Sequence, residues 1–327
     1  MLRRSRTGTW MPAWVPGSTA FLSVLLLACS MAQTGTNGCD GTMLNGFNIL
    51  PSYNNYFNLT NTTKGLNTAS IFIGGFLGLF WAGMMADRLG RRPAIFWGSL
   101  ITLVGIILQT AAQHIAMFVI ARVVLGWGNA IGGVAGAVYL SETFPNRWRA
   151  WGVGLLNNCY YVGAFFAALV TLGSSHLNST WAWRTPSLFQ AVFSIISIAV
   201  LPFIPESPRW LVGQGLFEEA RIAVAQTNSN GKLMDPVSTA VYKQIVDTLE
   251  WEKKQGRTMG VKEIFKTPMS RKRALIGGSV APFSCIAGNI IASYYLGAEL
   301  ETAGISDPNA QLKAACIHPL AWSSTYF

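Results

Sequence analysis

The chain consists of long apolar stretches separated by polar connectors. A membrane-spanning helix needs about 20 mostly apolar residues, because each residue adds only about 1.5 Å toward a hydrocarbon layer about 30 Å thick. Seven stretches reach that length, at approximately 18–50, 67–86, 93–112, 115–141, 150–172, 187–205 and 274–298. The first is long and is expected to be broken, and the tail 311–327 is expected to begin an eighth span. The pattern predicts an all-α membrane protein.

One long polar stretch, 206–273, separates the sixth and seventh apolar stretches. Its segments 208–226 and 237–255 have apolar residues at helical spacing, and we expect short amphipathic helices there. The residues 228–231, Asn-Ser-Asn-Gly, predict a turn between them. The expected division is an N-terminal transmembrane bundle of six spans (1–205), a cytosolic helical loop (206–273) and the start of a second bundle (274–327).

Composition supports a membrane location. Hydrophobic residues make up 51% of the chain and charged residues 12%, whereas soluble domains carry about 25% charged residues. The formal net charge is +10, but the cations lie between apolar stretches, so they indicate membrane topology rather than a nucleic-acid surface. The five cysteines lie in or beside apolar stretches without a C-x-x-C pair, and we interpret them as small buried side chains.

The charges also predict an orientation. Cytoplasmic connectors of membrane proteins are enriched in Lys and Arg. Placing the N-terminus inside puts twenty of the 24 Lys and Arg residues on the cytosolic side. The same orientation puts all three N-x-S/T sequons, at Asn58, Asn61 and Asn178, in outer loops, where we expect glycosylation. Arg3, Arg4 and Arg6 before the apolar residues 21–28 are similar to a signal peptide, but the many later spans favour a first transmembrane helix.

Glycines recur in the second and fourth apolar stretches. Small residues at such spacing let helices in a membrane approach closely, so we expect packing contacts at these positions. They are Gly74, Gly75, Gly78 and Gly83 in the second stretch, and Gly126, Gly128, Gly132, Gly133 and Gly136 in the fourth.

Two polar motifs follow the second and sixth stretches. They are Asp87-Arg88-Leu89-Gly90-Arg91-Arg92 and Pro205-Glu206-Ser207-Pro208-Arg209-Trp210-Leu211. Further motifs are Arg122 to Gly126, Gly128 to Tyr139 with Ser141 and Glu142, Trp183-Arg184-Thr185-Pro186 with Gln190, and Gly288-Asn289 with Ser293-Tyr294-Tyr295-Leu296. Together they resemble the sugar porters of the major facilitator superfamily, in particular the fungal lactose-permease-like and hexose transporter branch, over about residues 20–300.

The resemblance implies a major facilitator N-terminal six-helix bundle, cytosolic amphipathic helices, and one or two spans of a second half. Sugar porters have twelve spans in two halves with the substrate between them. This chain stops near the eighth, so we expect a shortened member of the family.

Two charged residues, Asp40 and Arg122, fall inside apolar stretches. An ionised group at the bilayer centre costs about 2.5–3.5 kcal/mol on insertion scales, so such groups are usually paired or functional. The first and fourth spans run antiparallel and can bring these residues to similar depth in the outer half. The resemblance implies that Asp40 marks proton symport and that Arg122 is its partner. A static pair that only positions the helices is the alternative.

Sugar hydroxyls both donate and accept hydrogen bonds, so amides and aromatic rings in a wet cavity suit them. The candidate substrate-binding residues are Asn157 and Asn158 in the fifth span and Asn289, Tyr294 and Tyr295 near the seventh. Interhelical hydrogen bonding is the alternative role. The sequence departs from the family at Ser284, Cys285, Ile286 and Asn157, so the sugar could be a disaccharide such as lactose or a hexose.

Charged residues of the loop motifs form the third candidate group. The resemblance implies a cytosolic gating network of ion pairs that holds the outward-open state, and plain positive-inside anchoring is the alternative. The candidates are Asp87, Arg88, Arg91, Arg92, Glu142, Arg149, Glu206 and Arg209.

The leading hypothesis is proton-coupled sugar symport by alternating access, in a multi-pass protein of the plasma membrane. A transporter-like sugar sensor and a non-transporting fragment that associates with full-length transporters are the alternatives. The expected partners are sugar, proton and the lipid bilayer, and no nucleic acid. The sequence carries no nucleophile elbow, P-loop or metal-ligand cluster, so we expect neither an enzyme nor a cofactor or metal site.

Overall fold

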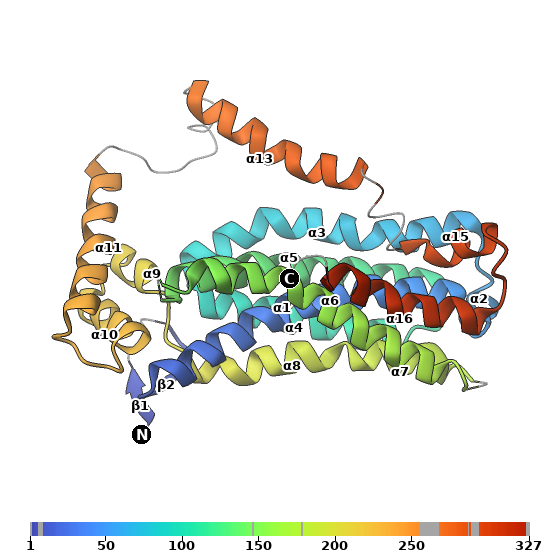
Figure 1. Cartoon of the computed structure of the whole chain (residues 1–327), viewed down its shortest axis with the longest axis horizontal. Helices are drawn as coiled ribbons and strands as arrows, with labels where there is room; N and C mark the ends of the chain where they lie inside the picture. The colour runs from blue at the N-terminus through green and yellow to red at the C-terminus, as the bar shows by residue number, and fades with distance from the viewer. Residues whose placement is uncertain are drawn as a thin grey trace.

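The structure, a computed structural model, describes residues 2–5, 9–145, 147–177, 179–254, 268–286, 288 and 294–324. Six helices among these residues are long and apolar enough to span a membrane. They run side by side as an elongated bundle (Figure 1). They are α1 (Thr19–Ile49), α3 (Asn61–Leu89), α4 (Arg91–Thr110), α5 (Ile115–Thr143), α6 (Arg149–Ser174), and a sixth span, Trp181–Phe203, made of α7 (Trp181–Phe189), α8 (Ala191–Val200) and the 3-10 turn η1 (Leu201–Phe203). The short helix α2 (Pro51–Phe57) follows α1.

These helices coincide with the first six apolar stretches, so the prediction of an all-α membrane bundle is confirmed. The expected break in the first span is wrong, because α1 is one helix of 31 residues. Its glycines are contact points rather than breaks. A Cβ atom at Gly38 would overlap with the backbone carbonyl oxygen of Tyr160 on α6, and one at Gly163 of α6 would overlap with that of Gly35.

Glycines join α3 to α5 in the same way. A Cβ atom at Gly74 would overlap with the carbonyl oxygen of Val123, and a Cβ at Gly126 would overlap with that of Ile71. The expectation of packing glycines is confirmed at these positions. Gly83 is an exception, since a Cβ there would meet no atom within 4 Å. Close backbone approach of this kind is how helices associate in lipid, where apolar burial provides no drive.

Residues 206–254 of the polar stretch after the sixth span fold into three helices at the predicted cytosolic end of the bundle (Figure 1). They are α9 (Pro208–Gly213), α10 (Phe217–Asn228) and α11 (Pro236–Lys254). The first expected amphipathic helix is therefore split, because Gly215 adopts a left-handed φ of 80°. Ser207 begins α9: its hydroxyl accepts a hydrogen bond from the Trp210 N–H at 3.3 Å, ahead of proline at the first turn.

A short antiparallel hairpin at the N-terminus is the one feature outside the helical expectation. Strand β1 (Leu2–Ser5) pairs with β2 (Ala13–Pro16), with Ser5 opposite Ala13. Met11 and Pro12, just before β2, are held by Arg92 at the start of α4, whose guanidinium donates to their carbonyls at 3.4 Å and 3.0 Å. Backbone carbonyls thus satisfy a buried guanidinium, which apolar helix faces do not.

The last described segments are α13 (Pro268–Ile286), α15 (Leu296–Thr302) and α16 (Pro308–Ser324). Figure 1 shows α13 apart from the bundle, whereas α16 lies along α6. The predicted seventh span 274–298 includes 287 and 289–293, which lie outside the described residues. Within the described ones it is interrupted at Gly288, whose φ of 86° is incompatible with a continuing helix. Helix α16 occupies the expected eighth segment.

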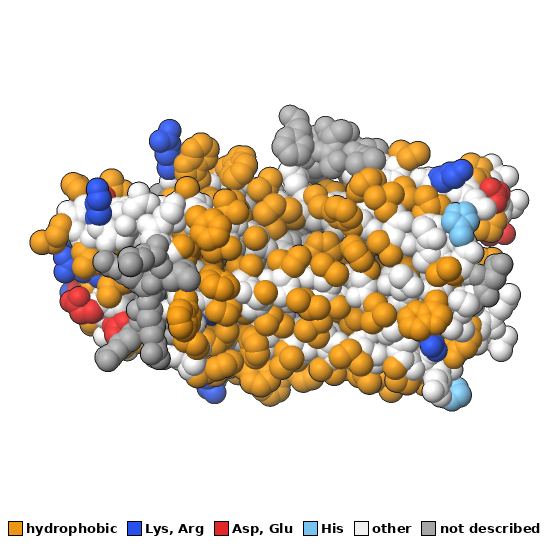
Figure 2. All heavy atoms as spheres, turned by 90° about the horizontal axis from the view of Figure 1, so that it is seen from below, with side chains coloured by type: hydrophobic (Ala, Val, Ile, Leu, Met, Phe, Trp, Pro, Cys, Tyr) orange, Lys and Arg blue, Asp and Glu red, His pale blue; other side chains and the backbone are white. Residues whose placement is uncertain are grey.

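The surface of the bundle is that of a protein in lipid. Hydrophobic side chains cover the middle of the visible face, and charged side chains are confined to its two ends (Figure 2). Many large apolar side chains of α3 are exposed, including Phe80 at 62% and Trp81 at 52%. A band of exposed apolar side chains is unfavourable in water and favourable in the hydrocarbon of a bilayer.

Substitution of Gly163 by valine is expected to destabilise the bundle. The added side chain meets the backbone of Gly35 and must separate α1 from α6, and overpacking of this kind typically costs about 1–3 kcal/mol. The thermal unfolding midpoint of detergent-solubilised Gly163→Val should fall by several degrees. The matched control is Gly173→Val on the same helix, where a Cβ meets no atom within 4 Å. Equal midpoints for the two variants would contradict the packing role.

Candidate functional site

A cavity of about 1280 Å³ opens among the spans. Its volume exceeds the roughly 300–1,000 Å³ typical of small-molecule sites. Its walls come from α1, α3, α5 and α6, with Tyr294, Leu296 of α15, and Ala315 and Pro319 of α16 on one side. The polar residues that line it are Thr34, Asn37, Asp40, Thr42, Asn45, Asn129, Asn157, Asn158, Tyr160, Tyr161 and Tyr294.

Asp40 is the only acidic residue among those that line this cavity, and it forms an ion pair with Arg122. Arg122 Nη1 lies 3.1 Å from Asp40 Oδ1, and both residues are almost fully buried. Arg122 Nε donates to the Asn67 carbonyl at 3.1 Å. Asp40 Oδ2 and Arg122 Nη2 have no hydrogen-bond partner, so the pair retains a free acceptor and a free donor.

Helix geometry explains why the two meet. Asp40 lies nine residues before the end of α1, and Arg122 lies seven residues after the start of α5. Since both positions are about two turns from the same end of antiparallel helices, they have similar depth. The charge of one offsets the cost of burying the other.

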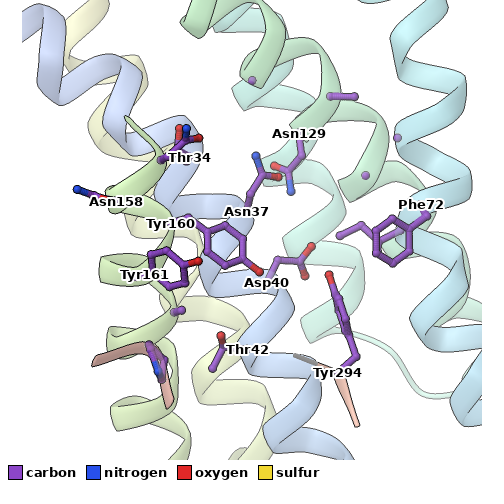
Figure 3. A pocket seen from close by; sticks show the side chains of 18 of the residues that line it. Thr34, Asn37, Asp40, Thr42, Phe72, Asn129, Asn158, Tyr160, Tyr161 and Tyr294 are labelled. Atoms are coloured by element: carbon purple, nitrogen blue, oxygen red, sulfur yellow. The ribbon is translucent and has the colours of Figure 1, made fainter. Parts of the chain in front are cut away.

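Two phenol hydroxyls point toward Asp40 from different elements (Figure 3). A Cβ atom built on Gly41, the next residue, would lie 3.1 Å from the Tyr160 hydroxyl and 3.2 Å from the Tyr294 hydroxyl. Tyr294 also packs its ring edge-on against Phe72 of α3, with ring centroids 5.7 Å apart. The carboxylate therefore borders the cavity beside two groups that both donate and accept hydrogen bonds.

The structure places some of the predicted substrate-binding residues in the cavity and one of them elsewhere. Asn157, Asn158 and Tyr294 line the cavity. Tyr295 instead packs against an apolar cluster that includes Phe47 and Trp183, so it is not among the lining residues. Asn289 lies outside the described residues.

Several lining residues were not selected from the sequence. Asn37 and Asn129 lie above Asp40 in Figure 3, and Tyr160 and Tyr161 come from α6. Helical spacing offered a signal on α6, because residues three and four apart share a face and Asn157 is followed at these intervals by Tyr160 and Tyr161. No comparable signal marked Asn129, which lies in a run of glycines.

The second cluster of charges lies at the predicted cytosolic end. The Arg91 guanidinium binds Glu142 with both a 2.9 Å contact from Nε to Oε2 and a 3.2 Å contact from Nη2 to Oε1. Arg91 Nη1 also lies 3.3 Å from Asp87 Oδ1, and the Ser207 hydroxyl donates to Glu142 Oε2 at 2.6 Å. This cluster ties α3, α4 and α5 to the start of α9.

Glu206 is the buried centre of this end. Its carboxylate accepts backbone N–H bonds from Arg91 at 3.0 Å, Arg92 at 3.3 Å and Ser207 at 2.9 Å. It therefore supplies acceptors to the free N–H groups at the start of α4, where the helix dipole also favours an anion. Burial raises the pKa of the Glu206 carboxyl, and the Ser207 N–H and the charge of Arg92 oppose that rise.

Four residues of the predicted cytosolic network have other surroundings. Arg92 donates from Nη2 to the Leu201 carbonyl at 2.7 Å as well as to the N-terminal segment. Arg209 pairs with Glu252 of α11 at 2.8 Å. Arg149 Nη2 reaches only the Phe144 carbonyl at 3.5 Å, and among the described residues neither Arg149 nor Arg88 has an ion-pair partner.

The sequons Asn58 and Asn61 lie at the predicted outer end, between α2 and α3, and both side chains are exposed. Asn58 caps α2 in a left-handed conformation with a φ of 47°. Asn178 lies outside the described residues.

Comparison with known proteins identifies the family. The family model described as "Sugar (and other) transporter" matches residues 26–321, which is most of the chain. The chain belongs to this sugar transporter family. Its members are membrane transporters rather than enzymes, and this member is a multi-pass membrane protein.

The curated relatives are fungal and bacterial transporters. The chain is 34% identical over 232 residues to the MFS-type transporter criB of Aspergillus cristatus, covering 71% of this chain and 50% of the relative. It is 30% identical to the high-affinity glucose transporter of Kluyveromyces lactis, covering 81% of this chain and 48% of the relative. The chain thus spans about half the length of these two relatives.

Solved structures share the fold. The xylose transporter XylE from E. coli, in a partially occluded inward-open conformation, superposes with a TM-score of 0.73 at 18% identity. The match covers 94% of this chain and 69% of XylE. At this identity the likeness establishes the fold of the sugar transporter family for this chain.

Replacement of Glu206 by alanine is expected to weaken the cytosolic end. The change leaves three backbone N–H groups of a buried turn without an acceptor, and an unsatisfied buried group typically costs about 1–3 kcal/mol. The thermal midpoint should fall clearly, and limited proteolysis of the 206–254 region should accelerate.

The control is Glu252→Ala, which breaks the partly exposed pair with Arg209, an interaction worth about 0–1 kcal/mol. If Glu252→Ala proved as destabilising as Glu206→Ala, the central position of Glu206 would be refuted.

Proposed function

We propose that this protein takes part in proton-coupled sugar symport by alternating access. The observation that carries the proposal is the Asp40–Arg122 pair, which is buried at the edge of a cavity lined by amides and phenols. A protonatable group at the sugar cavity is what coupling requires. The family membership supports sugar as the cargo class, and relatives include proteins named as glucose transporters and an arabinose-proton symporter.

The free Oδ2 of Asp40 is where a proton binds. Protonation neutralises Asp40 and weakens its attraction to Arg122, which remains charged because a guanidinium does not deprotonate in proteins. Helix α1, together with α6 that packs against it, can then move relative to α5. A proton moving through about 100 mV supplies about 2.3 kcal/mol, which supports roughly fiftyfold sugar accumulation.

The sugar occupies the cavity next to this pair. Asn157 and Asn158 of α6 offer amides for its hydroxyls, and Tyr294 offers a ring for its apolar face. The cavity admits either a disaccharide such as lactose or a hexose.

The Arg91–Glu142–Glu206 cluster is the latch of the outward-open state. It joins three spans and the first cytosolic helix at one end. The Arg91 and Glu142 side chains are 11% and 12% exposed, so water reaches this pair more readily than the Asp40–Arg122 pair, and it separates at lower cost.

Uptake of radiolabelled glucose and lactose in transporter-null yeast at pH 5.5 and 7.5 tests the proposal. Accumulation above the medium concentration at the lower pH is the expected result for the coupled transporter. Saturable sugar binding without any uptake would instead favour a sensor, and the plasma membrane would be checked by fluorescence of a tagged chain.

Asp40→Asn is expected to abolish accumulation while sparing part of the sugar exchange. The amide keeps the size of the side chain but cannot carry the proton. Undiminished accumulation would rule out Asp40 as the coupling group. Asp247→Asn is the control, because Asp247 is an exposed residue of α11 outside both the cavity and the cytosolic cluster.

We also propose glycosylation at Asn58, Asn61 and Asn178. Treatment with an endoglycosidase should increase gel mobility of the wild type, and the shift should shrink in Asn58→Gln and Asn61→Gln. An unchanged mobility on treatment would place these asparagines away from the secretory lumen.

A further inference from the structure

The Tyr160 side chain is held at the crossing of two spans. The Tyr160 carbonyl packs against Gly38 of α1, and the next turn of α6 packs Gly163 against Gly35. These backbone contacts fix the position of the Tyr160 backbone beside Gly38, which lies two residues, or about half a helical turn, before Asp40 on α1. Its ring packs edge-on to Tyr161 with centroids 5.5 Å apart, which limits ring rotation.

From this position the Tyr160 hydroxyl points toward Asp40 and borders the cavity (Figure 3). Its position beside Gly41 puts it next to the carboxylate that has a free Oδ2. Tyr161, its neighbour, lines the same cavity.

The surroundings of Asp40 limit which groups can link it to a ligand. Arg122 of α5 occupies Oδ1. The remaining polar or titratable neighbours are Cys39 on the same helix, Gln190 between α7 and α8, Tyr160 of α6 and Tyr294. Cys39 and Gln190 are almost fully buried and are not among the cavity residues. Among the described residues that line the cavity near Asp40, Asn37 and Asn129 carry amides, which do not titrate, whereas Tyr160 and Tyr294 carry hydroxyls that point toward the carboxylate.

We infer that Tyr160 is a positioning residue for coupling, whose hydroxyl joins the bound sugar to Asp40. A phenol can reverse the direction of its hydrogen bonds. When the carboxylate is ionised, the hydroxyl turns to donate to Asp40 Oδ2, which has no hydrogen-bond partner in the structure. When Asp40 carries the proton, the acid donates to the phenol oxygen, and the phenol proton turns to an oxygen of the sugar.

Sugar binding and protonation therefore favour each other, because the phenol proton is available to the sugar only when Asp40 is protonated. Such reciprocal coupling typically changes affinity about 5–150-fold. The inference rests on the proposed proton-coupled function and adds the group through which the two sites communicate.

The test is the pH dependence of sugar affinity for the whole chain in proteoliposomes, with glucose and lactose as probes. Wild-type affinity should fall about tenfold between pH 5.5 and 7.5. In Tyr160→Phe, which keeps the ring, the fall should shrink to less than about twofold while binding at pH 7.5 persists. Tyr56→Phe on α2, which removes a phenol hydroxyl from a residue that does not line the cavity, is the control and should behave as the wild type.

Gly41→Ala is a second variant, which is expected to displace the Tyr160 hydroxyl without removing it. The added methyl group would lie 3.1 Å from the Tyr160 hydroxyl and 3.2 Å from the Tyr294 hydroxyl, so both hydroxyls must shift by a few tenths of an ångström and the pH dependence should weaken with both rings present. If Tyr160→Phe is poorly folded, wild-type pH dependence in Gly41→Ala would still contradict the role of the phenol. The double variant Asp40→Asn/Tyr160→Phe should equal Asp40→Asn alone, because the two residues act in series.

The outcomes separate the two claims. Wild-type pH dependence in both Tyr160→Phe and Gly41→Ala would overturn the role of Tyr160 and leave coupling through Asp40 intact. A wild-type chain whose sugar affinity does not change with pH, or that binds neither sugar, would overturn the proposed coupling and this inference with it.

Discussion

The peptide group has no water to bind inside a bilayer, and this constraint underlies the rest of the structure. Each span must satisfy its own backbone as a helix, and helices must associate without a hydrophobic drive. Close backbone contacts at glycines provide that association, as at Gly74 with Val123 and Gly38 with Tyr160. Because these contacts leave little freedom, they also determine how each helix is rotated, and so which side chains face the cavity.

The protein holds charge in two different environments. Asp40 and Arg122 are both almost fully buried, so each is costly without the other, and a change in the charge of one strongly affects the pair. The Arg91–Glu142 pair at the predicted cytosolic end is partly hydrated, so it opens at lower cost. The first environment suits a proton site, and the second suits a contact that breaks and re-forms in each transport cycle.

Residue type and depth sufficed to identify the charged centre of the site. An aspartate and an arginine within apolar stretches are rare enough to be noticed, and antiparallel helices of known length place them at one depth. The uncharged lining was harder to predict. No pattern in the sequence distinguishes the adjacent tyrosines Tyr294 and Tyr295, yet Tyr294 lines the cavity and Tyr295 packs in an apolar cluster.

The sequence by itself determined the six spans, the predicted side of each connector and the presence of a buried charge pair, because all three depend on length, hydropathy and charge along the chain. Only the tertiary structure decided the partners. Arg209 binds Glu252 rather than the cluster at Glu206, Arg92 binds carbonyls of the N-terminal segment, and Gly215 divides the first cytosolic helix. These outcomes depend on helix rotation and on contacts between segments remote in sequence, and a one-dimensional pattern contains neither.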